Sequence, residues 1–286
     1  MPQLRDSGNH PISDTSGKAP TRSAEESGIA PGRPDRFDRI FGIETEYGVS
    51  VTGDDAPDDA GLVAMEMFAP VVSRTRSTNT YLGNGSRLYL DVGSHPEYAT
   101  AEARDPMDAL AQDLAGERVM RRLALRAQER LRERHGTDLH VHLYKNNADS
   151  AGHSFGCHEN YLVRRYVPLT MIEQQLLPFL ITRQIFTGAG RMTSEGFQIT
   201  QRADFLDEGV SSATTRARPM VNTRDEPHAD PDAYRRLHVI IGDSNRSQFA
   251  TWMKLATTHL VLCVMESALR ILRDGGSERR QPRRQP

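Results

Sequence analysis

The stretch FGIETEYGV, residues 41–49, alternates with a period of two between large or β-branched side chains and a set made only of Gly and Glu. This period predicts a β-strand with one buried face and one open face. The open face would carry Gly42, Glu44, Glu46 and Gly48. Carboxylates beside glycines that let a ligand approach closely suit hard cations such as Mg²⁺. A solvated outer face of an edge strand is the alternative interpretation.

A second stretch, RLYLDVGSHPE at residues 87–97, repeats the alternation and adds further functional groups. Arg87, Tyr89 and Asp91 would share one strand face, and Glu97 follows closely. An arginine can neutralise phosphate charge, an aspartate can accept a proton and a glutamate can hold a metal ion. A structural pairing of Arg87 with Asp91 is the alternative, and it leaves the other groups without a role.

Two weaker patterns follow further along the chain. In SFGCHENY, residues 154–161, the period of two predicts that Gly156, His158 and Asn160 share a strand face. Zinc is a poor fit there, because Cys157 and His158 would point in opposite directions. The loop region that contains Arg216, Arg218 and Arg224 is dense in phosphate-type donors, although a surface loop rich in salt bridges would look the same. The roles of these arginines, of His158 and of Glu46 stay open.

The remaining chain mixes strands and helices without a regular βαβ rhythm, which predicts an α+β fold with a largely antiparallel sheet. Further strands are expected at 139–144 and 158–163. Helices are expected after the Asp105-Pro106 cap signal, over 116–134, over 168–186, and from a cap at Ser244 or Asn245 to Ile271. We expect residues 1–38 to be a disordered leader, 39–272 to form the folded domain, and 273–286 to be a disordered Arg/Gln/Pro tail.

Composition narrows the classes of function. The formal net charge of −2 gives no global field for nucleic acid, and two cysteines do not make a disulfide framework and fit a reducing cytoplasm. No apolar run is expected to reach the length of a membrane span. The chain has no P-loop, no dinucleotide fingerprint and no nucleophile elbow, so an ATP enzyme of this sequence would need carboxylate-held metal ions and arginines. We therefore expect a cytoplasmic protein without membrane or nucleic-acid partners.

Taken together, these motifs resemble the family of Pup ligases and Pup deamidases, Pup being a ubiquitin-like protein tag. The resemblance runs from about Arg39 to Ile271. It is carried by residues 42–48, 84–102, 145–147, 157–162, 222–230 and 235–245. The segment between Gly48 and Asn84 is too short for the loop that typifies the deamidase branch, which favours the ligase branch. The resemblance implies a glutamine synthetase-like fold, with a curved, mostly antiparallel sheet that forms a cradle backed by helices.

The resemblance also implies a site. Glu44, Tyr89 and Glu97 match metal-site positions for Mg²⁺, Arg87 and Thr100 match ATP contacts, and Asp91 matches the catalytic base. The implied partners are Pup and lysine-bearing target proteins. The implied reaction activates the C-terminal glutamate of Pup as a γ-glutamyl phosphate and transfers it to a lysine.

Two other hypotheses stay open. Chains of this family continue well beyond this C-terminus, so a truncated, non-catalytic paralogue that binds Pup or nucleotide is one. A Pup deamidase or depupylase is the other.

Overall fold

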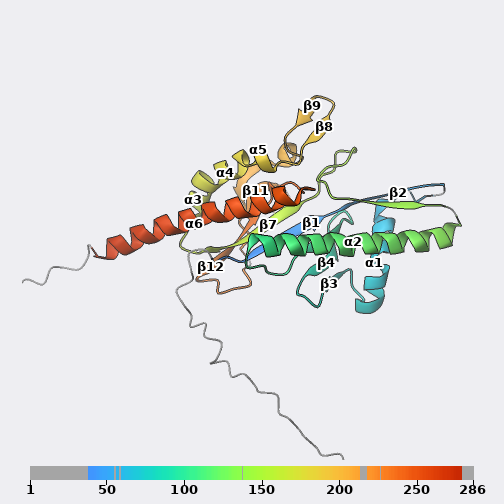
Figure 1. The fold of residues 1–286 in the computed structure, drawn as a ribbon, viewed down its shortest axis with the longest axis horizontal. Coiled ribbons are helices and arrows are strands. Elements are labelled where there is room, and N and C mark those ends of the chain that lie inside the picture. Colours follow the sequence, from blue (N-terminus) through green and yellow to red (C-terminus); the bar gives the residue numbers. More distant parts are fainter. Residues whose placement is uncertain are drawn as a thin grey trace, which may run out of the picture. The chain divides into compact units, whose positions relative to one another are not determined.

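The computed structural model of the chain describes residues 38–54, 56–57, 59–136, 138–212, 218–225 and 227–278. Its centre is an eight-stranded sheet in the order β10-β11-β12-β7-β1-β5-β4-β3 (Figure 1). The strands are β10 (Glu208–Ser211), β11 (Pro219–Asn222), β12 (Tyr234–Val239), β7 (Cys157–Arg164), β1 (Phe41–Glu46), β5 (Pro96–Ala99), β4 (Arg87–Leu90) and β3 (Asn79–Tyr81). Every neighbouring pair is antiparallel except β10 with β11. The predicted α+β class and mostly antiparallel sheet are confirmed.

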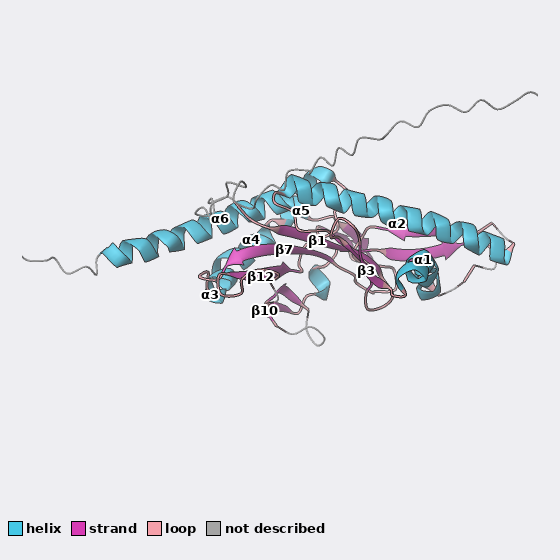
Figure 2. Ribbon diagram, turned by 90° about the horizontal axis from the view of Figure 1, so that it is seen from below, coloured by secondary structure: helices cyan, strands magenta, loops and turns pink. Residues whose placement is uncertain are grey.

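Two small sheets and several helices complete the fold. The small sheets pair β2 (Gly48–Thr52) with β6 (His140–Tyr144), and β8 (Arg191–Thr193) with β9 (Gly196–Gln198). The helices are α1 (Ala60–Thr75), α2 (Pro106–His135), α3 (Leu169–Met171), the π-helical turn η1 (Ile172–Leu176), α4 (Leu177–Thr182), α5 (Gln184–Thr187), the 3₁₀ turn η2 (Ala203–Phe205) and α6 (Gln248–Glu278). The long helices α2 and α6 run along one side of the main sheet (Figure 2).

The strand predicted over residues 41–49 is divided at Tyr47. Glu46 still belongs to the main sheet, where its N–H donates to the carbonyl of Gly156 at 3.1 Å. The Tyr47 N–H donates to the carbonyl of Pro96 at 2.9 Å, and β2 then leaves the main sheet to pair with β6. The division keeps Glu44 and Glu46 on one rigid strand.

The two helical segments predicted before and after Gly116 form one continuous helix, α2. The Asp105 side chain caps it by accepting from the N–H groups of Met107 and Asp108, at 2.8 and 2.9 Å. Gly116 lies mid-helix against the Tyr98 ring, where an added Cβ would come within 2.3 Å of Cδ1. The glycine therefore permits the close packing of α2 on β5 and does not end the helix.

Helix α6 differs from its prediction at both ends. Ser244 and Asn245 are buried and do not cap it, since the Ser244 N–H donates to Asn147 Oδ1 at 2.6 Å and Asn245 Nδ2 donates to the carbonyl of Thr187 at 2.7 Å. The Ser247 hydroxyl instead accepts from the Ala250 N–H at 3.3 Å. The helix continues to Glu278, beyond the predicted boundary at 272, and the expected leader up to 37 and tail from 279 lie outside the described residues.

Helix α6 is also the one described helix that is long and apolar enough to cross a membrane by length and composition. Its window Gln248–Arg273 has a mean hydropathy of 1.5, so the expectation that no run reaches this length is not met there. Core helices of soluble proteins pass the same test, and this makes the observation weak evidence for a membrane. Leu255, Leu262 and Met265 of α6 are buried in the core cluster that also contains Tyr161 of β7.

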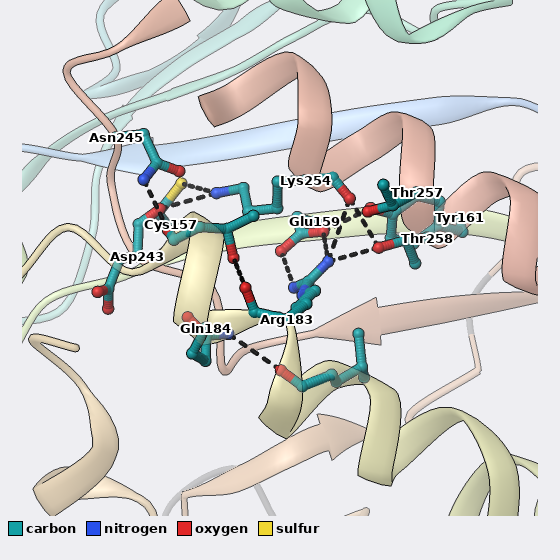
Figure 3. Close-up of polar contacts among 12 residues, drawn as sticks. Cys157, Glu159, Tyr161, Arg183, Gln184, Asp243, Asn245, Lys254, Thr257 and Thr258 are labelled. Carbon is teal, nitrogen blue, oxygen red and sulfur yellow. Dashed lines mark hydrogen bonds and ion pairs between the residues drawn. The ribbon is translucent and has the colours of Figure 1, made fainter. Parts of the chain in front are cut away.

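The side of β7 that faces α6 also carries a buried polar network (Figure 3). Glu159 and Arg183 are fully buried and form an ion pair with Nη2–Oε1 and Nη1–Oε2 distances of 2.6 and 2.9 Å. Arg183 Nη1 also donates to the Thr258 hydroxyl at 2.5 Å, and the Tyr161 hydroxyl donates to Glu159. Next to it, Lys254 Nζ donates to the carbonyl of Asp243 at 2.7 Å. Each buried charge on this side thus has polar partners.

Candidate active site

The strand register brings the predicted site residues onto the other face of the same sheet. On β1, Glu44 lies opposite His158 of β7 and opposite Ala99 of β5. Glu97 of β5 lies opposite Glu46 on one side and opposite Tyr89 of β4 on the other. Because alternate residues of a strand point to the same face, four neighbouring strands converge their functional side chains there. The predicted alternation is confirmed over residues 41–45, where Gly42 and Glu44 are more exposed than their neighbours, whereas Glu46 is buried and Gly48 lies in β2.

Three carboxylates form the first cluster of this face, which we call the acidic cluster: Glu46, Asp91 and Glu97. One oxygen of each lies within 4.8 Å of the others. Burial raises the pKa of Glu97 well above its usual range, and the charges of Glu44 and Glu46 raise it further. Burial and the charge of Glu46 likewise raise the pKa of Asp91. Crowded oxygen ligands that repel one another fit a hard divalent cation, which would offset their charge.

Glu44, His158 and His238 form a second cluster, again with ligand atoms within 4.8 Å of one another. His158 Nδ1 lies 3.3 Å from Glu44 Oε2, and its Nε2 lies 4.0 Å from Glu46 Oε1, so this side chain links the two clusters. Burial opposes ionisation of Glu44, but the hydrogen bond from His158 and neighbouring positive charge, including that of Arg236, outweigh it and lower the pKa of Glu44. Burial lowers the pKa of His238 to about 3, which leaves a neutral imidazole suited to a metal ion.

Gly156 explains how these side chains approach so closely. A Cβ at this position would lie 2.2 Å from His158 Nε2 and 2.7 Å from Glu46 Oε1. Cys157 points to the opposite side, where its Sγ lies 3.7 Å from Lys254 Nζ. Among the described residues, neither metal-ligand cluster includes a cysteine.

Tyr89 contacts the acidic cluster through its hydroxyl, which donates to Glu97. Burial and the neighbouring charge of Glu97 raise the pKa of Tyr89, so the phenol stays protonated. The guanidinium of Arg87 lies over the Tyr89 ring, 4.1 Å from its centroid. Arg87 Nε donates to Asn79 Oδ1 at 2.8 Å, and no ion pair joins Arg87 to Asp91. The structural pairing considered for these two residues is therefore wrong.

Thr100 directly follows β5 and lies near Gly42, on the sheet face that carries Glu44. Its hydroxyl accepts from the Ile43 N–H at 3.1 Å and lies near Gly42 and Asn160. Asn160 Nδ2 donates to Glu44 Oε1 at 3.1 Å. Thr100 thus borders the Glu44 cluster, in a gap that Gly42 leaves open.

Asp91 lies just after β4, at the start of a tight turn. Its N–H donates to the carbonyl of His95 at 2.9 Å, and its carbonyl accepts from the Ser94 N–H at 3.0 Å. The left-handed conformation of Gly93, with φ of 83°, closes the turn. Residues 92–96 form one wall of a hollow of about 960 Å³, and residues 148–150 and 152–155 form another. The side chain of Asp91 thus belongs to the acidic cluster, and the residues that directly follow it in the chain line the cavity.

Several polar residues of this face were not predicted. His238 and Arg236 come from β12, whose alternation over residues 234–239 could have indicated them. Arg236 Nη1 donates to Asn160 Oδ1 at 2.8 Å and lies 3.9 Å from Glu44 Oε1. Arg218 lines the hollow, Arg224 lies beyond β11, and Arg216 falls outside the described residues.

Known proteins share this sequence and this arrangement. The family model described as Pup-ligase protein matches residues 39–280. The chain is 74% identical over 279 residues to the Pup–protein ligase of Bifidobacterium dentium, covering 98% of this chain and 55% of that protein. It is 73% identical over 270 residues to the Pup–protein ligase of Bifidobacterium longum, covering 94% of this chain and 53% of that protein. The chain thus spans about half the length of the curated relatives it matches.

Two solved structures are similar to the fold. One is the complex between the prokaryotic ubiquitin-like protein Pup and its ligase PafA, with a TM-score of 0.75, 45% identity, and coverage of 81% of this chain and 47% of that one. The other is the Pup ligase PafA in complex with ADP, with a TM-score of 0.62 and 47% identity. That match covers 76% of this chain and 48% of the other. The match confirms the expected glutamine synthetase-like architecture. On the family match and this shared fold, the chain belongs to the Pup-ligase family.

Proposed function

We propose that the protein ligates Pup to lysines of target proteins in an ATP- and Mg²⁺-dependent reaction in the cytoplasm. The observation that carries this proposal is the convergence of Glu44, Glu46, Asp91 and Glu97 on one face of the sheet, next to an open hollow. Relatives named Pup–protein ligase, and similar structures whose proteins bind Pup or ADP, support it.

Magnesium fits the side chains of this face. Glu97 and Glu44 would hold it, and Glu46 belongs to the same acidic cluster as Glu97. Tyr89 contributes to the metal site as a neutral hydroxyl that donates to Glu97 and fixes its orientation. When bound, Mg²⁺ offsets the negative charge that builds up during phosphoryl transfer.

Arg87 and Thr100 would contact ATP. Arg87 lies on β4 opposite Ala99, the residue before Thr100, so both positions border the same end of β5. A guanidinium matches phosphate oxygens with two parallel hydrogen bonds, and a threonine hydroxyl can donate a further one.

The reaction then has two steps. A γ-carboxylate oxygen of the C-terminal glutamate of Pup attacks the γ-phosphorus of ATP, and ADP leaves. The lysine nitrogen attacks the carbonyl carbon of the resulting γ-glutamyl phosphate, the C–O bond to phosphate breaks, and an isopeptide bond forms. Asp91 accepts the proton that the lysine must lose, since an ammonium has no lone pair with which to attack. Its place in the acidic cluster, directly before the residues that line the hollow, suits this role.

Replacing the proposed base tests this function. With Asp91→Asn we expect conjugate formation to fall by about 10²–10⁴-fold, the usual contribution of general base catalysis. ATP binding should change little, because the carboxamide keeps the size of the side chain. The measurement is a gel assay with glutamate-terminated Pup, Mg²⁺-ATP and a lysine-bearing protein, together with a binding titration of ATP. Conjugation at the wild-type rate in D91N would overturn the role of Asp91, and no conjugation by the folded wild-type chain would overturn ligase activity for this chain.

A further inference from the structure

Lysine is almost absent from this chain, although positive charge is not. Of its 36 Lys and Arg residues, only three are lysines: Lys18, Lys145 and Lys254. Arginines carry the positive charge of the surface, for example Arg122 and Arg126 on the exposed side of α2. The two residue types differ in reactivity, because a lysine can lose its proton and act as a nucleophile, whereas an arginine stays protonated.

Lys254 of α6 is closed off inside the core. Its side chain is fully buried, and its Nζ donates to the carbonyl of Asp243 at 2.7 Å (Figure 3). The same Nζ lies 3.7 Å from Cys157 Sγ of β7. Lysine is almost never fully buried in proteins unless it is paired. The amine of Lys254 is therefore out of reach of any second reactant.

Lys145, directly after β6, is also buried and is held by two carboxylates. Its Nζ donates to Asp113 Oδ2 and to Glu117 Oε1 of α2, both at 2.6 Å. Burial opposes ionisation of Lys145, but the charge of Asp113 and the hydrogen bonds to both carboxylates outweigh it and raise its pKa. The amine is thus kept both inaccessible and protonated, and an ammonium has no lone pair with which to attack.

A general preference for arginine codons does not explain this distribution. Such a preference would lower the number of lysines at every kind of position. The two lysines that remain in the described fold instead occupy buried positions, where lysine is normally rarest, and no lysine is exposed among the described residues. The surface of the fold thus keeps positive charge while it excludes the one side chain that forms isopeptide bonds.

Lys18 is the remaining lysine, and it lies outside the described residues. It belongs to the segment 1–38 that the sequence predicts to be a disordered leader. The residues around it, SDTSGKAPTR at 13–22, include no large apolar side chain. A sequence of this kind has nothing with which to bury an amine, so we expect Lys18 to be accessible.

We propose that the folded domain withholds its lysines from the conjugation chemistry of its own family, so that Lys18 is the single acceptor of Pup on this chain. That the chain itself performs this modification rests on the proposed function. The deprotonated Nζ of Lys18 attacks the carbonyl carbon of the γ-glutamyl phosphate, and the C–O bond to phosphate breaks. Phosphate leaves with the electron pair, the proton from nitrogen passes to Asp91, and an isopeptide bond joins Lys18 to Pup.

The first test measures lysine accessibility and needs no ligase activity. The native 286-residue chain is treated with the N-hydroxysuccinimide ester of acetic acid, and acetylation is mapped by mass spectrometry. Lys18 should react at least roughly 100-fold faster than Lys145 and Lys254, because those two must wait for the fold to open. In urea the three rates should converge. Acetylation of Lys145 or Lys254 in the native protein at the rate of Lys18 would overturn the proposal.

The second test maps conjugation itself, with glutamate-terminated Pup and Mg²⁺-ATP. The chain is incubated alone and, separately, with the full-length Pup–protein ligase of Bifidobacterium dentium and a lysine-bearing control protein. We expect one Pup-modified peptide from this chain, at Lys18, and none from Lys18→Arg. Adding Arg122→Lys to that variant should restore conjugation, at residue 122, because it exposes one amine on the surface of α2.

The outcomes of this test separate the two proposals. Conjugation of Lys18 only when the full-length ligase is present would overturn ligase activity for this chain and leave the inference about its lysines standing. Conjugation at Lys145 or Lys254 of the folded chain would overturn that inference. So would a chain that stays unmodified at Lys18 while the control protein is conjugated. Failure of Arg122→Lys to restore conjugation would contradict the role given to the surface arginines.

Discussion

The two faces of strand β7 handle buried charge in opposite ways. On the side toward α6, Glu159 accepts from Arg183 and Tyr161, and Arg183 donates in turn to Thr258. On the other side, His158 lies among carboxylates that repel one another, and the pKa of Glu97 is raised as a result. Glu159 thus belongs to a network of paired charges, whereas His158, the residue before it on the same strand, belongs to a cluster whose charges are not balanced.

The difference separates structural from functional charge. A network whose charges are paired with one another offers little to a ligand, and it specifies how α4, α5 and α6 pack on the sheet. An unbalanced cluster costs stability in the free protein, and a ligand of the missing sign recovers that cost on binding. The buried arginines repeat the contrast. Arg183 is paired with Glu159 and lacks a partner only at Nε, whereas Arg202 lacks one at both Nε and Nη1 among the described residues.

The largest effect should come from breaking the matched side. Arg183→Met leaves Glu159 buried without a counter-ion, so we expect the free energy of unfolding to fall by about 3–5 kcal/mol. Urea denaturation followed by circular dichroism measures this change. A matched variant, Arg183→Met together with Glu159→Met, should recover much of the loss because no charge is then left unpaired. If R183M unfolded at the wild-type urea concentration, the network would not be the structural element described here.

A smaller and opposite effect should follow on the unbalanced side. Glu97→Gln removes one of the crowded charges and keeps an oxygen that can accept from Tyr89, so the metal-free protein should be as stable as the wild type or more so. Binding of Mg²⁺ should weaken by at least roughly tenfold, about 1.4 kcal/mol. Thermal unfolding with and without Mg²⁺ measures both quantities.

Glu159→Gln is the matched control for this variant, because it makes the same change on the other face of the sheet. It should destabilise the metal-free protein by leaving Arg183 without a counter-ion. Mg²⁺ should still raise its melting temperature, since the acidic cluster is intact. Destabilisation of E97Q to the level of E159Q would refute the contrast between the two faces.

Local sequence patterns predicted which side chains share a strand face, but not which residues of other strands lie next to them. The alternation over 41–46 and 87–90 put Glu44 with Glu46, and Arg87 with Tyr89, on one strand face each, because a strand fixes side-chain direction locally. The pairing of Glu44 with His158, 114 residues away, depends on strand order, which no local period encodes. The grouping of Glu44, Glu97 and Asp91 was implied by family resemblance alone.

The errors came from residues whose tertiary partners override a local signal. Ser244 reads as a helix cap, but a buried Asn147 takes its hydrogen bonds. Gly116 was placed at the start of a separate helical segment, but it lies inside one continuous helix, where the Tyr98 ring leaves no room for a side chain. Arg202 carries no periodic signal, and its burial without a partner is visible only in the structure. Charge balance within a core is a three-dimensional property, so the sequence could not supply it.

The smallest effect should come from a matched charge that water reaches. Glu66 of α1 accepts from Arg130 and Arg134 of α2, at 2.5 and 3.0 Å, and both arginine side chains are substantially exposed. We expect Glu66→Gln to cost only about 0.2–1 kcal/mol, because solvent screens the pair. Burial opposes ionisation of Glu66, but the hydrogen bonds and charges of the two arginines outweigh it and lower its pKa.

The sign of the pH effect follows from that lowered pKa. The contribution of Glu66 is fully present above its unfolded pKa and is lost as the pH falls through its folded pKa, so wild type and E66Q should converge in stability under acidic conditions. High salt should also make the stabilities of wild type and E66Q converge at neutral pH. The loss of stability in R183M should persist in high salt, because water does not reach the pair of Arg183 and Glu159. Urea titrations at low and high salt therefore test whether burial, rather than pairing alone, sets the worth of a matched charge in this protein. If E66Q lost as much stability as R183M, and salt did not change that loss, burial would not set the worth of a matched charge.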